Sequence, residues 1–398
     1  MKITILSQYY FPEIGAAANR WTDYSKLLAE MGNDVTVICE KPNYPLGRVY
    51  EGYENKKSEI IVQSQLRIIR TWVIINKRNN NIKRILYFVS FMFSSLLSGL
   101  KLSKPDVLIA SSPPLFVGIT GWVLSKYYKI PLVTDIRDLW PESAIVLNEL
   151  TSPIGKQIGY IMQNTVYKNT SLFLTAVPGF KKFLMKNIYA KNKPMLPLLN
   201  GIGEDLIQHC KNEKIIDYKH INIIYAGNIG LAQNLKIILE TARKLDDNFQ
   251  FKIIGDGVNK EYLVSLAKYY GLTNVQFKNS LSTIDLINEY QQAHIGIVCL
   301  HDNALFRNAI PSKTFEYMAF GLAVFCLVKG EIEKIIYESQ AGKCCNPENE
   351  NDLVEKIKNI TKNELKLMGQ AGKKYVVKNL RKSELIKSVV SKIEVILK

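Results

Sequence analysis

Residues 307–321, RNAIPSKTFEYMAFG, carry the clearest set of side chains able to do chemistry. Ser312 can cap a helix in this segment, and Gly321 can end it. Lys313 and Glu316 are three residues apart, so they lie on one face of that helix near its positive end. A lysine there can balance a phosphate while a glutamate accepts hydrogen bonds from a ribose diol. The spacing favours a nucleotide site, and a solvated i,i+3 ion pair is the alternative.

Glycine-bearing turns follow three predicted strands. Gly227-Asn228-Ile229-Gly230 follows the apolar run at 221–226, Gly15-Ala16-Ala17 follows the first strand, and Gly255-Asp256-Gly257 follows a third. Backbone N–H groups in such turns can approach an anion, although a tight strand-to-helix connection is the alternative. The chain has neither a Gly-x-Gly-x-x-Gly pattern nor a P-loop, which disfavours a dinucleotide dehydrogenase and a P-loop ATPase.

A third constellation is TDIRDLWPES at residues 134–143. It comes at the carboxyl end of a predicted strand, where open α/β sheets bind ligands. We expect Arg137 and Asp138 to face such a crevice, and a salt-bridged turn is the alternative. The four histidines show neither a catalytic triad nor paired metal spacing.

The elements that must position these residues alternate along the whole chain. Strands are expected near 2–7, 33–39, 107–110, 132–135 and 172–176, then from 221, 251, 275 and 295, and helices are expected between them, including 21–32, 117–128 and 154–169. This alternation predicts an α/β fold with mostly parallel sheets and helices on both faces.

The stretch 200–220 has no strong period and mixed charge, as a connection between domains does. We therefore predict an N-terminal domain over 1–200 and a C-terminal domain over 201–382. Residues 383–398 are predicted to form an amphipathic helix that could pack back on the first domain.

The composition narrows the class of protein. The chain has 398 residues, and 52 Lys and Arg against 36 Asp and Glu give 52 − 36 = +16, which favours nucleic acid, anionic lipid or phosphorylated substrates. The basic residues are spread along the chain, which disfavours nucleic-acid binding. Six scattered cysteines indicate neither a zinc site nor a disulfide framework, so a reducing cytoplasm fits best. We interpret the opening MKITILSQYY as a strand, since no signal-peptide cleavage site follows it.

One segment differs from the rest, because Ile85–Leu100 runs sixteen residues without a charge. It is flanked by Lys83, Arg84, Lys101 and Lys104. Apolar and aromatic residues beside basic ones are typical of a helix lying in a membrane interface. A core helix is the first alternative. A membrane span is the second, although a span needs about 20 residues.

Taken together, these motifs resemble a family 4 glycosyltransferase of the retaining GT-B type. The resemblance covers nearly the whole chain. SQYYFPEIGAAANRWTDYSKLLAEMGNDVTVIC is similar to the N-terminal acceptor-side unit, PLLNGI to the end of that domain, and PSKTFEYMAFGLAVF to the donor-binding helix. The combination of DIRDLWPES, AGNIGLAQNL and PSKTFEYMA is further similar to the branch that builds bacterial O-antigens and capsules, often with N-acetylated deoxyamino sugars such as N-acetyl-fucosamine. The resemblance implies two Rossmann-like domains facing each other across a cleft.

The resemblance also implies roles for individual residues. Glu316 matches the second glutamate of the family's Glu-x7-Glu motif, which holds the donor ribose, but Asn308 stands at the first. The family's diphosphate-binding Arg and Lys fall at Asn228 and Gln233, so turn N–H groups, Lys313 and Arg307 would bind the diphosphate instead. Arg137 stands where the family has a histidine, and Asp138 is retained. The implied donor-side residues are Asn228, Ile229, Gly230, Gln233, Gly255, Gly257, Arg307, Asn308, Ser312, Lys313 and Glu316; the catalytic ones are Arg137 and Asp138; the acceptor-side ones are Gly15, Ala16, Asn19, Arg20 and Glu142.

The implied activity is transfer of a sugar from a UDP-sugar, with retention and without a metal or other cofactor, to a polyprenyl-diphosphate-linked saccharide. Such an enzyme would sit at the inner face of the cytoplasmic membrane, docked through residues 83–104 on an anionic surface. Two alternatives remain open: a nucleotide-sugar epimerase with the same fold, and a non-catalytic membrane-associated scaffold.

Overall fold

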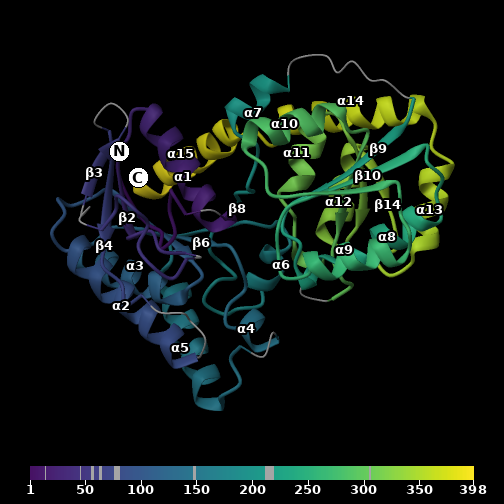
Figure 1. Ribbon diagram of the computed structural model, residues 1–398. Helices are drawn as coiled ribbons and strands as arrows, with labels where there is room; N and C mark the ends of the chain where they lie inside the picture. The colour runs from purple at the N-terminus through teal and green to yellow at the C-terminus, as the bar shows by residue number, and fades with distance from the viewer. Residues whose placement is uncertain are drawn as a thin grey trace. The chain divides into compact units, whose positions relative to one another are not determined.

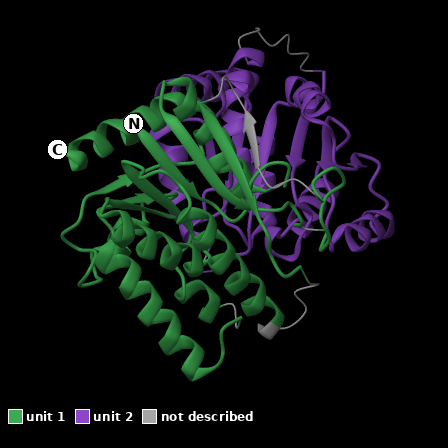
Figure 2. Cartoon of the chain, turned by 90° about the vertical axis from the view of Figure 1, so that its left-hand side faces the viewer, with its two compact units in different colours: residues 1–200, 382–398 green, residues 201–381 purple. Residues whose placement is uncertain are grey.

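The chain folds into two compact units (Figures 1 and 2). The computed structural model describes residues 1–13, 15–44, 46–54, 58–61, 65–75, 81–146, 149–210, 219–303 and 306–398. Unit 1 comprises Met1–Asn200 and Lys382–Lys398, and unit 2 comprises Gly201–Arg381. Part of the predicted connection, residues 211–218, lies outside the described residues.

Unit 1 is built on a sheet in the order β3-β4-β2-β1-β5-β6-β7-β8. Every pairing is parallel except β3 with β4, which is antiparallel. The strand order reverses between β1 and β5, which places a topological switch point there. The elements of unit 1 are β1 (Lys2–Leu6), α1 (Ala16–Glu30), β2 (Asp34–Glu40), β3 (Ser58–Ile61), β4 (Leu66–Thr71), α2 (Asn81–Gly99), β5 (Val107–Ser112), α3 (Leu115–Tyr128), β6 (Leu132–Ile136), α4 (Glu142–Val146), α5 (Pro153–Asn169), β7 (Leu172–Thr175), α6 (Phe180–Leu184), β8 (Met195–Pro197) and α15 (Lys382–Leu397).

Alternation along the strands of unit 1 sends side chains to two separate cores. On one face, Ile3 and Ile5 of β1 pack with residues of α1 and α15. On the other face, Leu6 packs with residues of α2 and α3. The final helix therefore lies on α1 although it follows unit 2 in the chain, as Figure 2 shows by its colour. Its amphipathic pattern has a partner within unit 1.

Helix α2 buries Tyr87 and Phe91 together with three serines, and it leaves other large apolar residues on the surface. Ser90, Ser94 and Ser95 are buried, and each hydroxyl donates to the carbonyl oxygen three residues earlier. A Cβ at Gly99 would lie 2.4 Å from Leu124 Cδ1, so α2 and α3 approach closely. The large residues left on the surface form what we call the α2 outer face: Ile85, Leu86, Phe93, Leu97 and Leu100, with exposed fractions of 36–55%.

Unit 2 has a six-stranded parallel sheet in the order β11-β10-β9-β12-β13-β14. One core lies between this sheet and α8, α9 and α13. The opposite face carries α11, where Gly296 leaves room for the ring of Tyr317. The elements of unit 2 are α7 (Glu204–His209), β9 (Ile221–Ala226), η1 (Leu231–Gln233), α8 (Lys236–Arg243), β10 (Phe249–Ile254), α9 (Lys260–Tyr269), β11 (Val275–Lys278), α10 (Thr283–Gln292), β12 (Ile295–Cys299), η2 (Phe306–Asn308), α11 (Lys313–Ala319), β13 (Ala323–Leu327), α12 (Glu331–Ser339), β14 (Gly342–Cys344), α13 (Glu350–Lys358) and α14 (Lys362–Asn379).

The predicted α/β class with parallel sheets and helices on both faces is confirmed. The predicted strands and helices agree with the observed ones to within a few residues, except that α1 begins at Ala16 rather than at Trp21. The spanning alternative for Ile85–Leu100 is wrong: in the described ranges, no helix combines the length and the apolar character needed to cross a membrane.

Candidate active site

The donor-side motifs of unit 2 gather at the carboxyl ends of its strands. The strand order reverses between β9 and β12, and open α/β sheets bind ligands beside the loops that follow the two strands at such a reversal. The turn at 227–230 follows β9, and α11 follows β12 through residues 300–312. The sheet topology thus places Lys313 and Glu316 beside the glycine turns.

Two glycine turns pack directly on each other at this point. A Cβ at Gly255 would lie 1.9 Å from the carbonyl oxygen of Gly227, and one at Gly257 would lie 2.3 Å from that of Ile229. Both glycines have positive φ, +143° and +155°, where side chains are strained. The Ile229 N–H donates to Asp256 O at 2.9 Å and ties the turns together. The glycines are therefore required by close backbone approach.

Two of the four backbone N–H groups expected to bind an anion already donate hydrogen bonds within the protein. In the turn from Asn228 to Leu231, the Ile229 N–H is donated to Asp256, and the Gly230 N–H is donated to Gln233 Oε1 at 3.1 Å. The N–H groups of Asn228 and Leu231 donate to no acceptor in the described part of the chain. Gln233 therefore holds the turn, and two N–H groups remain for a ligand.

Lys313 carries the positive charge at this turn. Its Nζ lies 3.9 Å from the centre of the Tyr225 ring, and a Cβ at Gly227 would lie 2.3 Å from that Nζ. No ion pair of Lys313 occurs among the described residues, so the alternative of a solvated pair with Glu316 is not observed. Burial lowers the pKa of Lys313 to about 8. The ammonium is thus held at the glycine turn without a carboxylate to neutralise it.

Glu316 is oriented by a buried tyrosine. The Tyr290 hydroxyl donates to Glu316 Oε2 at 2.8 Å, while Oε1 accepts no hydrogen bond from the described residues. Helix α11 is also fixed to β9, because the Ala226 N–H donates to Tyr317 Oη at 2.9 Å. One carboxylate oxygen of Glu316 is therefore available to accept hydrogen bonds from a ligand.

Three other donor-side predictions have different outcomes. The predicted cap is wrong: Ser312 precedes α11, but its φ and ψ are helical and its side chain accepts no capping hydrogen bond. Gly321 ends the helix at φ +69°, as the sequence predicts. Arg307 donates to Asp302, which Lys329 also contacts, so part of its charge is balanced there. Asn308 lies in η2, directly after Arg307.

In unit 1, Arg20 is buried rather than exposed to a ligand. Its Nη2 lies 2.7 Å from Asp135 Oδ1, and the two side chains are 1% and 0% exposed. Its Nε also donates to Asp135, and its Nη1 donates to Asn200 Oδ1 at 2.8 Å. Trp21 Nε1 and Ser111 Oγ donate to the same carboxylate. Arg20 therefore joins α1 to β6 and to the end of unit 1.

The predicted catalytic pair is divided between two environments. Asp138 is exposed, and its carboxylate accepts hydrogen bonds from the Leu139 N–H and the Ser143 hydroxyl, both at 2.8 Å. Arg137 is half-buried, and its Nη2 donates to the carbonyl oxygen of Pro113. The salt-bridged turn expected as the alternative is not formed between these two residues, although the preceding Asp135 is salt-bridged.

The remaining acceptor-side residues lie at two helix starts. Gly15 precedes α1 at φ +151°, and Ala16 and Asn19 are exposed in its first turn. Glu142 opens α4 and accepts hydrogen bonds from Gln163. Burial raises the pKa of the Glu142 carboxyl. None of these contacts excludes a ligand from the exposed α1 residues.

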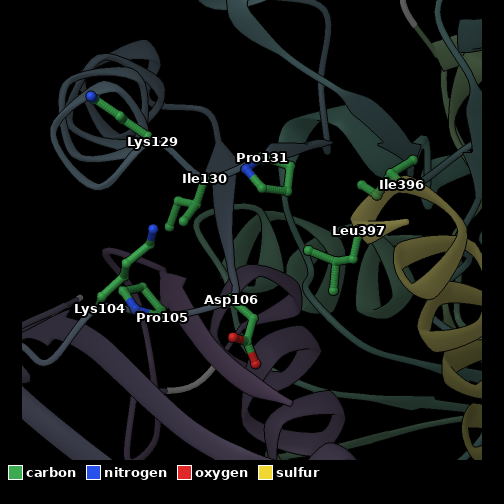
Figure 3. Close-up of a pocket in the computed structure, with 8 residues that line it drawn as sticks. All are labelled: Lys104, Pro105, Asp106, Lys129, Ile130, Pro131, Ile396 and Leu397. Carbon is green, nitrogen blue, oxygen red and sulfur yellow. The ribbon is translucent and has the colours of Figure 1, made fainter.

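A cavity of about 470 Å³ lies at the other edge of the unit 1 sheet (Figure 3). It sits where β5 and β6 begin, beside the end of α15, and Lys104 and Lys129 line it. The motifs above follow the carboxyl ends of the strands, so this cavity is separate from them. No group of three or more His, Cys, Asp or Glu side chains in the described ranges is arranged to hold a metal ion.

Three tyrosines and one aspartate were not identified from the sequence. Tyr225 lies under Lys313 and donates to Asn228 O at 2.6 Å, Tyr290 holds Glu316, Tyr317 anchors α11, and Asp135 binds Arg20. The position of Tyr225, one residue before the end of a strand that leads into a glycine turn, was the available signal. Tyr290 gave none, since it lies on a separate helix.

The comparisons with known proteins agree with this architecture. Residues 209–375 match the family of glycosyl transferases group 1. The chain is 25% identical over 342 residues, 81% of its length and 82% of the relative's, to the putative colanic acid biosynthesis glycosyl transferase WcaI of Escherichia coli K12. It is similar in structure to sucrose-phosphate synthase from Thermosynechococcus elongatus, with a TM-score of 0.76 and 14% identity over 99% of this chain and 98% of that one. It is also similar to Anabaena HepE in complex with UDP, with a TM-score of 0.71 and 12% identity over 99% and 100% of the two chains. The whole chain therefore has the GT-B fold of two Rossmann-like domains, and the segment 209–375, which makes up most of its second unit, matches the group 1 glycosyltransferases.

Proposed function

We propose that the protein transfers a sugar from a UDP-sugar to a lipid-linked saccharide in the synthesis of a bacterial surface polysaccharide. One observation carries the donor half of this proposal: Lys313 lies at the glycine turn of the unit 2 sheet, and Glu316, three residues later on the same helix, keeps one oxygen open. A cation at a turn with free N–H groups suits a diphosphate, and a fixed carboxylate suits a ribose diol.

The names of similar proteins support the substrate class. HepE was solved with UDP, and WcaI is named for colanic acid biosynthesis. The transferred sugar in this proposal is an N-acetylated deoxyamino sugar such as N-acetyl-fucosamine. It is inferred from the resemblance of DIRDLWPES, AGNIGLAQNL and PSKTFEYMA to transferases of O-antigen and capsule synthesis. The acceptor in this proposal is a saccharide on a polyprenyl diphosphate, bound by unit 1.

The proposed reaction keeps the configuration of the anomeric carbon. The bond from that carbon to the diphosphate breaks, and the acceptor oxygen bonds to the same face. The acceptor proton moves to an oxygen of the leaving diphosphate, so no protein nucleophile is required. Lys313 and the Asn228 and Leu231 N–H groups balance the charge on the diphosphate, which is the task a metal ion performs in other transferases.

The donor site is tested by calorimetric titration of UDP, GDP, dTDP and CMP. We expect selective binding of UDP, weakened about 10- to 100-fold in Glu316→Ala, because a charged hydrogen-bond acceptor for the ribose is lost. Glu261→Ala, an exposed glutamate on α9, is the matched control and should bind as the wild type does. A folded wild-type protein that binds no nucleotide would favour the membrane scaffold.

The membrane half of the proposal rests on the α2 outer face. The buried face of α2 is filled by Tyr87, Phe91 and three serines, so the five residues of the outer face stay exposed. Helix α5, which like α2 packs against α3, also exposes apolar residues: Ile154, Ile158 and Ile161. Lys101 and Lys104 are exposed at its edge, while Arg84 is paired with Glu149. An anionic membrane surface suits an apolar face with a basic edge. In this proposal the protein docks on the cytoplasmic face of the cytoplasmic membrane.

Co-sedimentation with anionic vesicles tests this docking. We expect Phe93→Ser with Leu97→Ser to reduce vesicle binding at least about tenfold, because two half-exposed apolar side chains no longer enter the interface. Lys101→Gln with Lys104→Gln should weaken binding to anionic but not to neutral vesicles. Tyr269→Ser, at an 85% exposed site in unit 2, is the control. Equal sedimentation of all variants would rule out docking through α2.

A further inference from the structure

The carboxyl edge of the unit 1 sheet holds a guanidinium that no carboxylate neutralises. Arg137 directly follows β6, and its N–H donates to Ser112 O at 2.8 Å. Its Nη2 donates to the carbonyl oxygen of Pro113. Its Nε is buried and finds no hydrogen-bond acceptor in the described part of the chain. No acidic oxygen of the described residues lies within 4.0 Å of this guanidinium. Burial without a counterion is costly for a cation, so the arrangement favours binding of an anion.

The two nearest aspartates are committed elsewhere. The Asp135 carboxylate accepts hydrogen bonds from Nε and Nη2 of Arg20, from Trp21 Nε1 and from Ser111 Oγ. These bonds occupy its lone pairs, and Arg20 balances its charge. Asp138 is exposed and accepts from the Leu139 N–H and the Ser143 hydroxyl. Burial and the charge of Arg20 lower the pKa of Arg137, against the opposing effect of Asp135, Tyr9 and Asp138. A net positive charge therefore remains at this edge.

A helix start lies next to the guanidinium. Pro113 accepts from Arg137, and Pro114 is the residue before α3, a 14-residue helix. No side chain caps α3, and its first turn contains no acidic residue. The N–H groups of Leu115 and Phe116 donate to no acceptor in the described ranges, whereas that of Val117 donates to Pro114 O. The free N–H groups and the positive end of the helix thus add to the charge of Arg137.

We propose that Arg137 and the first turn of α3 form an anion site within unit 1 that binds a phosphate group. A guanidinium fork and helix N–H groups match the oxygens of a phosphate in number and geometry. The inference rests on the proposed function, since that reaction supplies two such groups: the diphosphate of the lipid-linked acceptor and that of the nucleotide. In this proposal Arg137 binds the ligand, whereas Arg20 is buried and paired with Asp135.

The two sources are separated by titrating the full-length protein with two probes. Farnesyl diphosphate, with farnesol as the uncharged comparison, stands for the acceptor, and UDP stands for the nucleotide. We expect Arg137→Gln to weaken binding of farnesyl diphosphate about 10- to 100-fold and to leave farnesol unchanged, because one charge-assisted phosphate contact is lost. A loss confined to UDP would assign the same phosphate site to the nucleotide.

Controls keep the outcome decisive. Lys126→Gln removes one charge at the opposite end of α3 and should bind both probes as the wild type does. Arg137→Lys keeps the charge but loses the two-pronged guanidinium, so its affinity for farnesyl diphosphate should lie between those of the wild type and Arg137→Gln. It replaces Arg137→Gln in the test if that variant does not fold. Unchanged affinity of a folded Arg137 variant for both probes would overturn the phosphate site while leaving the donor site intact. Loss of UDP binding already in the wild type would instead overturn the proposed function.

Discussion

Replacing Asp135 by asparagine is expected to lower the free energy of unfolding by about 3–5 kcal/mol, the usual cost of leaving one member of a buried ion pair alone. Arg20 would keep its charge with almost no exposure, and the hydrogen bonds from its Nε and Nη2 would lose their charged acceptor. Since domains are stable by only about 5–15 kcal/mol, chemical denaturation should show this loss clearly.

Two further variants separate burial from charge in that experiment. Arg20→Met combined with Asp135→Asn should be less destabilising than the sum of the two single changes. Each single change leaves one buried charge alone, whereas the double variant leaves none. Glu149→Gln, which breaks the half-exposed pair with Arg84, should cost no more than about 1 kcal/mol. If Asp135→Asn costs no more than Glu149→Gln, the Arg20 network does not stabilise unit 1.

The order of strands and helices could be predicted from the sequence because each core strand is a short apolar run between helical patterns. Five strands were not predicted: β3, β4, β8, β13 and β14. β4, LRIIRT, alternates arginines with apolar residues, and β3 pairs with it at the sheet edge. β13, AVFCL, overlaps the end of the motif PSKTFEYMAFGLAVF, which was assigned to the donor-binding helix. β8 and β14 are three-residue strands at sheet edges, too short to give a strand pattern.

The orientation of α2 could not be derived from its composition. Apolar content alone predicts burial of the large residues, but close packing of α2 on α3 selects Gly99 and serines for the interface. The serine hydroxyls bond to their own helix, so their burial leaves no polar group unsatisfied. Which face looks outward is therefore decided by the neighbouring helix.

Spacing within one helix predicted part of the site, and contacts between distant segments decided the rest. Lys313 and Glu316 share a helix, so their proximity followed from three residues of separation. Arg20 and Asp135 are separated by 115 residues, and no local pattern joins them. Ser312 has the residue type of a cap, but its backbone is already helical, so its side chain cannot reach the first N–H groups.

The affinity for UDP is expected to fall as the pH rises through about 8, because Lys313 loses the proton that a diphosphate needs. A bound anion favours the charged form, so binding takes up a proton above this pH, and affinity drops by up to about tenfold per pH unit until the pKa of the complex is reached. Lys313→Met should bind UDP about 100-fold more weakly at pH 7 and without this slope.

Folding stability should change in the opposite direction over the same range. The folded-state pKa of Lys313, about 8, lies below the ordinary value of 10.5, so between these pH values the unfolded chain binds more protons than the folded one. The contribution of Lys313 to the free energy of unfolding therefore rises with pH across this window, and Lys313→Met should remove that rise. Lys268→Met, an exposed site on α9, should retain both slopes. If Lys313→Met keeps the slope in UDP affinity, another group titrates at the donor site. If Lys313→Met removes both the slope in UDP affinity and the slope in the free energy of unfolding, the same ammonium group is costly to bury at the glycine turn and binds the diphosphate.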